Sequence, residues 1–227
     1  MITIKNLKNP SNNVIFVSGI DTNIGKTIAT AALANTYKSM GYNTITQKMI
    51  QTGCVGESED IVKHRELMDI PMQNVDLDKT TCPIILSYPA SPHLSAELDK
   101  RKIDVDVINY ATNKLESVYD LVLLEGAGGL MVPVISNTQN KGNNQLGGYL
   151  TIDFIKENNF PVILVTCGKL GSLNHTLLSI DACIKRGIKI EAIVYNMHPK
   201  SDEIITQSSL EYLKELNIPL VILEEIK

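Results

Sequence analysis

Residues 14–27 read Val14-Ile-Phe-Val-Ser-Gly-Ile-Asp-Thr-Asn-Ile-Gly-Lys-Thr27, an apolar run followed by a glycine-bearing loop. The closing Gly25, Lys26 and Thr27 open an amphipathic, helical pattern. A strand, a loop and a helix in this order are typical of a phosphate-binding loop, in which backbone N–H groups and the helix N-terminus face the phosphates. Lys26 would bring positive charge to the terminal phosphates, and Thr27 would offer a hydroxyl to Mg²⁺.

This loop is one residue longer than the common form of the motif. The common form places four residues between its two glycines, whereas five residues separate Gly19 from Gly25 in this chain. Ile20 stands where the first glycine is expected. The added residue narrows the range of families to which the chain can belong.

Short apolar runs alternate with longer amphipathic segments along the whole chain. The predicted strands are 14–18, 44–49, 82–86, 121–125, 162–166, 190–195 and 220–223. Most are nearly continuous in apolar character, which is typical of parallel strands covered on both faces. The predicted helices are 26–40, 58–68, 105–117, 149–157, 172–186 and 202–216. The alternation predicts an α/β fold with a doubly wound, mostly parallel sheet, like that of P-loop NTPases.

Residues 1–227 are interpreted as one domain, with residues 1–13 as an extended lead-in to the first strand. Residues 136–148 are rich in Asn, Gln and Gly, which favours a surface loop. This loop is either a tolerated insertion or a lid over a site at the neighbouring strand end. In doubly wound sheets, ligands bind beyond the carboxyl ends of the strands.

Composition argues against several functional classes. The formal charge of −4 offers no basic surface for nucleic acid or anionic membranes. The N-terminus lacks the apolar stretch of a signal peptide, and no apolar run approaches the roughly 18 residues of a membrane span. We therefore expect a soluble, cytoplasmic protein. The cysteines lack metal-ligand spacing and are interpreted as reduced thiols; they are Cys54, Cys82, Cys167 and Cys183.

Lys48 ends an otherwise apolar predicted strand. It would point into the same crevice as the phosphate loop and place a second cation over a transferring phosphoryl group. The alternative is a surface lysine whose stem covers apolar neighbours. Thr52 and Gly53, just beyond, would offer a hydroxyl and an N–H group to a substrate.

Glu125 ends another apolar strand and is followed by Gly126-Ala-Gly-Gly129. In phosphate-loop enzymes an acidic residue at this point holds Mg²⁺ or its water, and the glycines let the backbone approach a ligand closely. Asp60 begins a helical pattern and is either an N-terminal helix acid or a further Mg²⁺ contact.

Asn196 ends the predicted strand 190–195. Its amide could pair with the N6/N7 edge of adenine, although a turn role is the simpler alternative. His93 and His175 have no partner at metal-ligand spacing, so neither is interpreted as a zinc ligand.

In chain order these motifs resemble the ATP-dependent dethiobiotin synthetases, and the resemblance extends from about residue 14 to 225. It is carried by the long phosphate loop, Lys48 with Thr52-Gly53, Ser91-Pro92-His93, Glu125-Gly-Ala-Gly-Gly129, Lys169-Leu-Gly-Ser-Leu-Asn-His175 and Asn196. It implies a cyclo-ligase of biotin biosynthesis that uses ATP and Mg²⁺. Such an enzyme adds CO₂ to one amine of 7,8-diaminopelargonate (7,8-diaminononanoate), phosphorylates the carbamate and closes the ureido ring, giving dethiobiotin, ADP and phosphate.

The resemblance also implies roles for individual residues. Lys48 and Lys26 would be catalytic, and Thr52 and Asn174 would contact the diamine. The implied metal ligands are Thr27, Asp60 and Glu125. The implied nucleotide contacts are Asn23, Ile24, Gly25, Lys26, Thr27, Ile28, Asp60, Glu125, Gly126, Ala127, Gly128 and Asn196. Members of the family are homodimers with the substrate site near the subunit interface.

Two other classes share parts of this pattern. A partitioning-type ATPase switch has the same fold but usually carries a lysine early in the loop, where this chain has Ile20 and Asp21. A glutamine-dependent amidoligase would need an added glutaminase domain, for which 227 residues leave no room.

Overall fold

The computed structural model describes residues 3–136, 147–198 and 201–224. Its central sheet has six strands in the order β10-β9-β8-β1-β5-β2, all parallel. These strands are β1 (Val14–Gly19), β2 (Thr44–Lys48), β5 (Leu121–Gly129), β8 (Val162–Cys167), β9 (Ile190–Asn196) and β10 (Leu220–Leu223). Two small sheets pair β3 (Gln51–Thr52) with β4 (Ile85–Leu86) and β6 (Pro133–Ile135) with β7 (Tyr149–Leu150). The predicted parallel α/β fold is confirmed.

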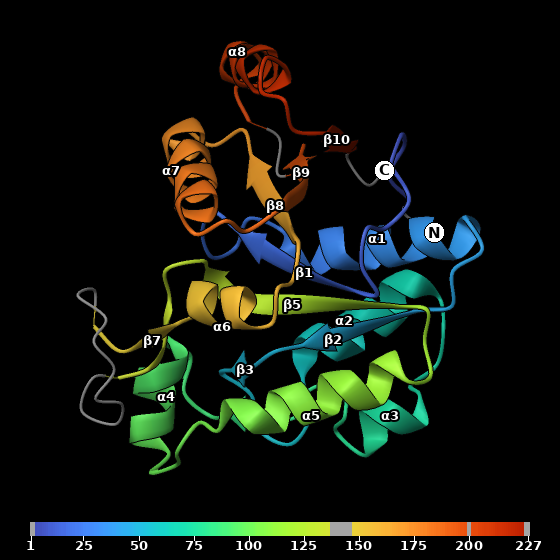
Figure 1. Cartoon of the computed structure of the whole chain (residues 1–227), viewed down its shortest axis with the longest axis vertical. Helices are drawn as coiled ribbons and strands as arrows, with labels where there is room; N and C mark the ends of the chain where they lie inside the picture. The colour runs from blue at the N-terminus through green and yellow to red at the C-terminus, as the bar shows by residue number, and fades with distance from the viewer. Residues whose placement is uncertain (1–2, 137–146, 199–200, 225–227) are drawn as a thin grey trace.

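Helices cover both faces of this sheet (Figure 1). They are α1 (Lys26–Ser39), α2 (Glu59–Met68), α3 (Asn74–Leu77), α4 (Pro92–Leu98), α5 (Val105–Glu116), α6 (Thr151–Glu157), α7 (Ser172–Lys185) and α8 (Glu203–Lys214). Among the described helices, none is both long enough and apolar enough to span a membrane.

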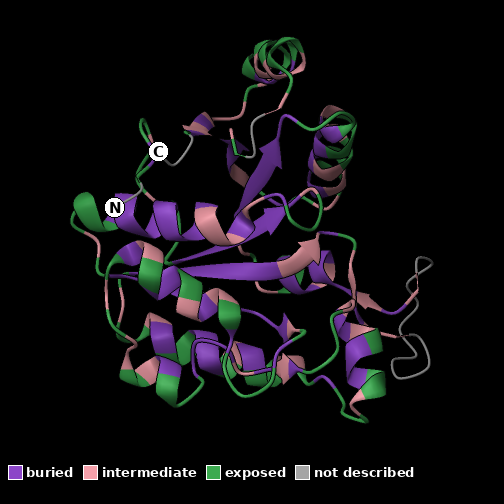
Figure 2. Ribbon diagram, turned by 180° about the vertical axis from the view of Figure 1, so that it is seen from behind, coloured by how far each residue is buried: buried purple, intermediate pink, exposed green. Residues whose placement is uncertain are grey.

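Successive residues of each central strand enter two different hydrophobic cores. On β1, Val14 and Phe16 pack in a core with α5, α6 and α7, whereas Ile15 and Val17 pack in a core with α1. Strand side chains alternate between faces, so strands buried on both sides are largely apolar. The exception is β2, in which Thr46, Gln47 and Lys48 are buried polar residues. Most residues of the central strands are accordingly buried (Figure 2), whereas the end of β5, the start of β9 and alternate residues of β10 are half-buried.

The predicted strand 82–86 does not join the central sheet, so that prediction was wrong. Only Ile85 and Leu86 form a strand, which pairs with β3. The segment runs beside the end of β2, where the carbonyls of Thr81 and Ile84 accept from the N–H groups of Lys48 and Gln51 at 2.7 and 2.9 Å. The segment therefore shapes the chain just beyond Lys48.

Residues 147 and 148 adjoin β7, and residue 136 follows β6. Most of the predicted 136–148 loop lies outside the described residues. The predicted helix 149–157 begins later, as α6 at Thr151, because its first two residues form β7.

Candidate active site

The phosphate-binding loop connects β1 to α1, and its lysine side chain bonds to the backbone of the same loop. Gly25 precedes α1 with φ +88°, and Asn23 also has a positive φ of 57°. The Nζ of Lys26 donates to the carbonyl of Asp21 at 2.8 Å, and only 7% of this lysine is exposed. Burial lowers the pKa of Lys26 to about 8, although the charge of Glu125 acts in the opposite direction.

Gly25 also lies against a residue from a distant strand. A Cβ atom at this position would stand 2.2 Å from the Nδ2 atom of Asn196. Asn196 itself donates from Nδ2 to the carbonyl of Ile24 at 2.9 Å. The loop thus packs against the end of β9. Only glycine at position 25 both adopts the positive φ and leaves room for the side chain of Asn196.

We expect Gly25→Ala to lower the free energy of unfolding by about 2–5 kcal/mol, because left-handed strain adds to a clash with Asn196. Gly41→Ala is the matched control, since Gly41 has φ +98° but a Cβ atom added to it would meet nothing within 4 Å. That variant should lose only about 1–2 kcal/mol, from the strain alone. Urea unfolding of both variants measures the difference. Equal losses of unfolding free energy would show that the contact with Asn196 does not destabilise Gly25→Ala.

Lys48, the last residue of β2, is the register partner of Glu125 in the middle of β5. The Nζ of Lys48 lies 2.8 Å from Glu125 Oε1 and 2.5 Å from Asp60 Oδ2, and it donates to the carbonyl of Gly126 at 3.1 Å. Lys48 is 5% exposed, so the alternative of a surface lysine is wrong. The cation is instead enclosed by acceptors from two segments of the chain, β5 and the first turn of α2.

Burial alone would lower the pKa of Lys48, but the carboxylates of Glu125 and Asp60 outweigh it and hold this pKa above its ordinary value. Burial would likewise raise the pKa of Glu125, yet the charge of Lys48, aided by His64, holds it well below its ordinary value. The pair is therefore a lysine cation and a glutamate anion at neutral pH.

The three predicted metal ligands converge on one point. The Oγ1 of Thr27 donates to Asp60 Oδ1 at 2.9 Å and lies 3.3 Å from Glu125 Oε1. No group of three His, Cys, Asp or Glu side chains in the described part of the chain is arranged to hold a metal by itself. Two carboxylates and a hydroxyl do fit Mg²⁺, which commonly takes one or two carboxylates and completes its shell with phosphates and water.

Asp60 is in the first turn of α2, whose N-cap Ser58 accepts from the N–H of Ile61. The prediction that Asp60 is an acid at a helix N-terminus is confirmed. Its carboxylate also contacts Lys48 and Thr27. Its N–H lies 3.3 Å from the Oε1 of Gln51, at the start of β3. The helix start and the β2–β3 segment together fix its position.

The glycine-rich residues 126–129, predicted to form a turn after Glu125, instead continue β5 and pack against the phosphate loop. A Cβ at Gly129 would meet the carbonyl oxygen of Gly19 at 3.2 Å, and one at Gly126 would meet the ring of Phe16 at 2.8 Å. Gly128 has φ +72°. Ala127 lies between these glycines on β5, and Ile28 is half-buried in the first turn of α1.

Sequence reasoning missed His64. It is fully buried on α2, and its Nε2 lies 2.8 Å from Glu125 Oε2. The available signal was its spacing of four residues from Asp60, which places both side chains on one helix face. His93 and His175 were considered and His64 was not, because it stands inside a helical pattern with no cysteine or second histidine at metal-ligand spacing.

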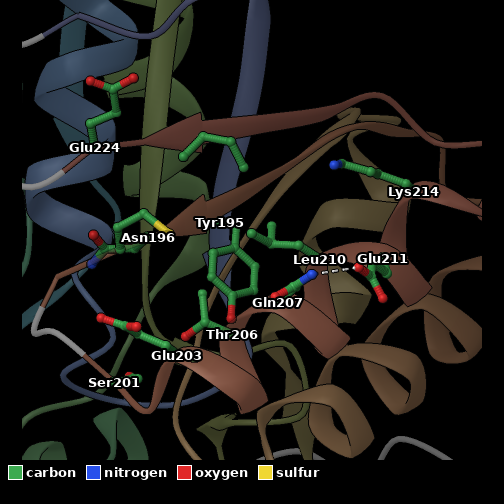
Figure 3. A pocket seen from close by; sticks show the side chains of 13 residues that line it. Tyr195, Asn196, Ser201, Glu203, Thr206, Gln207, Leu210, Glu211, Lys214 and Glu224 are labelled. Atoms are coloured by element: carbon green, nitrogen blue, oxygen red, sulfur yellow. Dashed lines mark hydrogen bonds between the residues drawn. The ribbon is translucent and has the colours of Figure 1, made fainter.

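Asn196 ends β9 and is 1% exposed. Besides the bond to Ile24, its Oδ1 accepts from the N–H of His198 at 3.0 Å. A cavity of about 690 Å³ begins beside it and extends under α8 (Figure 3). This cavity lies at the ends of β9 and β10 and not over Lys48 and Glu125. It is lined by apolar side chains, among them Met197 and Leu210, and by polar and acidic ones such as Thr206 and Glu203.

The two predicted substrate contacts lie on different parts of the fold. Thr52 is on β3, just beyond β2, and is half-buried. Asn174 is exposed in the first turn of α7, after β8. Since β5 and β1 separate β2 from β8, the two strand ends stand roughly 14 Å apart across the sheet.

Comparison with known proteins agrees with this geometry. A family model described as an AAA domain matches residues 13–219. The ATP-dependent dethiobiotin synthetase BioD of Chlorobaculum tepidum is 47% identical over 200 residues, which cover 88% of this chain and 79% of that protein. The ATP-dependent dethiobiotin synthetases BioD 2 of Haemophilus influenzae and Haemophilus ducreyi are 47% and 49% identical, over 86% and 89% of this chain and 96% and 90% of theirs.

Solved structures are similar in fold alone. A plasmid partition protein from Borrelia burgdorferi is 14% identical with a TM-score of 0.55, over 96% of this chain and 93% of that one. The signal recognition particle receptor FtsY from Elizabethkingia anophelis is 16% identical with a TM-score of 0.51, over 98% of this chain and 62% of that one.

Proposed function

The chain belongs to the family of ATP-dependent dethiobiotin synthetases, and we propose that it forms the ureido ring of dethiobiotin from 7,8-diaminopelargonate, CO₂ and ATP. The observation that carries this proposal is the cluster of Lys48, Glu125, Asp60 and Thr27 beside the phosphate loop, in a chain 47–49% identical to such synthetases. A cytoplasmic location is part of the proposal, because the reaction draws on ATP and the cysteines of the chain are free.

The reaction needs groups that stabilise negative charge. One amine of the substrate takes up CO₂ and loses a proton, which gives a carbamate. A carbamate oxygen then accepts the γ-phosphoryl group, and ADP leaves. The second amine attacks the carbonyl carbon of this mixed anhydride, loses a proton and expels phosphate as the ring closes. Charge grows on carbamate and phosphoryl oxygens in each step, so cations held in a water-poor site are the effective catalysts.

Lys26 and Lys48 supply these cations from two directions. Lys26 already donates to a loop carbonyl, and phosphate oxygens would take that place as its acceptors. Lys48 is held charged by Glu125 and Asp60, and the carbamate and acyl-phosphate oxygens are the further acceptors that we assign to it. Its burial keeps water from screening the charge.

Thr27, Asp60 and Glu125 would hold Mg²⁺, in agreement with their convergence on one point. When bound, Mg²⁺ neutralises charge on the β- and γ-phosphate oxygens. The nucleotide contacts that we assign are the loop residues Asn23, Ile24, Gly25, Lys26, Thr27 and Ile28 and the β5 residues Gly126, Ala127 and Gly128.

The base of ATP would lie on the Asn196 side. The triphosphate would lie along the phosphate loop, and the cavity that begins at Asn196 has the volume for a base. Each polar atom of the Asn196 amide makes one hydrogen bond, to Ile24 and from His198, which leaves one N–H and one oxygen lone pair for adenine.

We further propose that the active form is a homodimer. The ends of β2 and β8, which precede Thr52 and Asn174 in the chain, stand roughly 14 Å apart across one sheet. Asn174 is exposed, and a second copy could bring its α7 to the Thr52 side of the first. The substrate site would then be completed at the subunit interface.

The proposal is tested by omitting one component at a time from a phosphate-release assay. We expect release only when ATP, Mg²⁺, bicarbonate and 7,8-diaminopelargonate are all present, because the acceptor of the phosphoryl group is the carbamate and not water. The product should have the mass of dethiobiotin. ATP turnover that ignores the diamine would contradict the synthetase function and favour a partition-type switch, whose fold is similar.

A further inference from the structure

His64 is a buried polar side chain to which the reaction above gives no role. It has no solvent exposure and lies on α2, one helical turn after Asp60. Residues four apart on a helix lie on the same face, so α2 directs both side chains toward the Lys48–Glu125 pair. A histidine inside an apolar region is costly unless its ring is hydrogen-bonded. Its surroundings therefore call for a physical explanation.

The ring has one polar partner that the structure records. Its Nε2 lies 2.8 Å from Glu125 Oε2, whereas Nδ1 is buried without a hydrogen-bond partner among the described residues. A carboxylate only accepts hydrogen bonds, so Nε2 must carry the proton and donate. Nδ1 has no partner among the described residues, so the bond from Nε2 alone orients the ring. His64 thus offers one donor, and that donor is aimed at Glu125.

The two oxygens of Glu125 consequently have separate partners. Oε1 faces Lys48 at 2.8 Å and Thr27 at 3.3 Å, whereas Oε2 is bound by His64. A glutamate side chain could otherwise rotate about its last bond and exchange its oxygens freely. The bond from His64 opposes that rotation and holds Oε1 on the side of Thr27 and Asp60.

We propose that His64 is a positioning residue that sets the Mg²⁺ affinity of this site by fixing the carboxylate of Glu125. The inference rests on the proposed function only in taking Thr27, Asp60 and Glu125 as the metal ligands. Hydrogen-bond partners behind metal ligands typically contribute 10–100-fold in metal affinity or activity. His64 touches neither nucleotide nor diamine in this assignment, so its effect should appear in metal binding first.

The test compares His64→Leu, which removes the donor, with His64→Gln, whose amide nitrogen can lie near the position of Nε2. Mn²⁺ binding to the enzyme with saturating ADP is followed by the electron paramagnetic resonance signal of free Mn²⁺. We expect about 10–100-fold weaker Mn²⁺ binding for His64→Leu and less than about threefold change for His64→Gln. ADP binding without metal, measured by calorimetry, should be unchanged in both variants.

Each outcome decides the matter. Unchanged Mn²⁺ affinity in His64→Leu overturns the proposal, and so does equal weakening in the leucine and glutamine variants. If His64→Leu fails to fold, His64→Asn replaces it, because its amide is too short to reach Glu125 and should also weaken Mn²⁺ binding. These readouts need no turnover, so a chain without diamine-dependent phosphate release would refute the proposed function and leave the role of His64 to be judged separately.

Discussion

Replacing Lys48 with methionine is expected to lower the turnover number by about 100–1,000-fold or more, since one preorganised donor to a developing oxyanion typically contributes that much. Methionine keeps most of the side-chain volume and removes the charge. The measurement is phosphate release at saturating ATP, bicarbonate and diamine. Near-normal turnover would refute the catalytic role assigned to Lys48.

The same variant should also unfold more easily, because the structure places Lys48 between two carboxylates. Its removal leaves Glu125, which is fully buried, without its counter-charge. Removing one partner of a buried ion pair costs about 3–5 kcal/mol. Chemical unfolding at neutral pH measures this loss. Lys63→Met is the matched control. Lys63 pairs with Glu66 on the exposed side of α2, the helix that carries Asp60, and such exposed pairs contribute roughly 0–1 kcal/mol.

The loss should depend on pH in a definite direction. In the native chain the pKa of Glu125 is held below its ordinary value, so its contribution to stability is present above pH 4.5 and is lost as the pH falls. In Lys48→Met, burial alone acts on Glu125 and favours its protonated form. The difference in unfolding free energy between the two proteins should therefore shrink from pH 7 toward pH 4.5. A constant difference would contradict the buried ion pair.

The fold was largely predictable because the central strands are buried on both faces. Runs such as Val162–Cys167 must be apolar at nearly every position, and this leaves a clear pattern in the sequence. The segment 82–86 has the same pattern for a different reason. It buries apolar side chains beside the end of β2 without adding a strand to the central sheet, and a short apolar run does not distinguish these situations.

The convergence of Thr27, Lys48 and Glu125 was also predictable, because each follows or ends a predicted strand and parallel strands end at one edge. The bond from His64 to Glu125 was not, since a residue inside a helix reveals its partner only once the helix is docked. The bonds of Asn196 to the loop depend on a side-chain conformation that no sequence pattern records.

Mixing an inactive variant with a weakened one is expected to restore activity at low diamine concentration if the substrate site forms between two copies. Lys48→Ala should abolish turnover, and Asn174→Ala should lower it strongly at low diamine concentration, by about 10-fold or more if one hydrogen bond to a charged group is lost. In a two-fold symmetric dimer of one copy of each, one of the two sites keeps both residues. An equal mixture, unfolded and refolded together, should then recover about a quarter of the native activity.

The decisive control pairs Lys48→Ala with Lys26→Ala. Both lysines belong to one chain's site, where the charge of Lys48 lowers the pKa of Lys26. A dimer of one copy of each variant therefore lacks one of these lysines in both of its sites. That mixture should stay inactive while the Asn174 mixture recovers. If neither mixture recovers, Asn174 acts in the same chain as Lys48 or takes no part in the reaction. The separation of Thr52 and Asn174 would then no longer support a dimer. Recovery in the Asn174 mixture alone requires that Lys48 and Asn174 act from different copies.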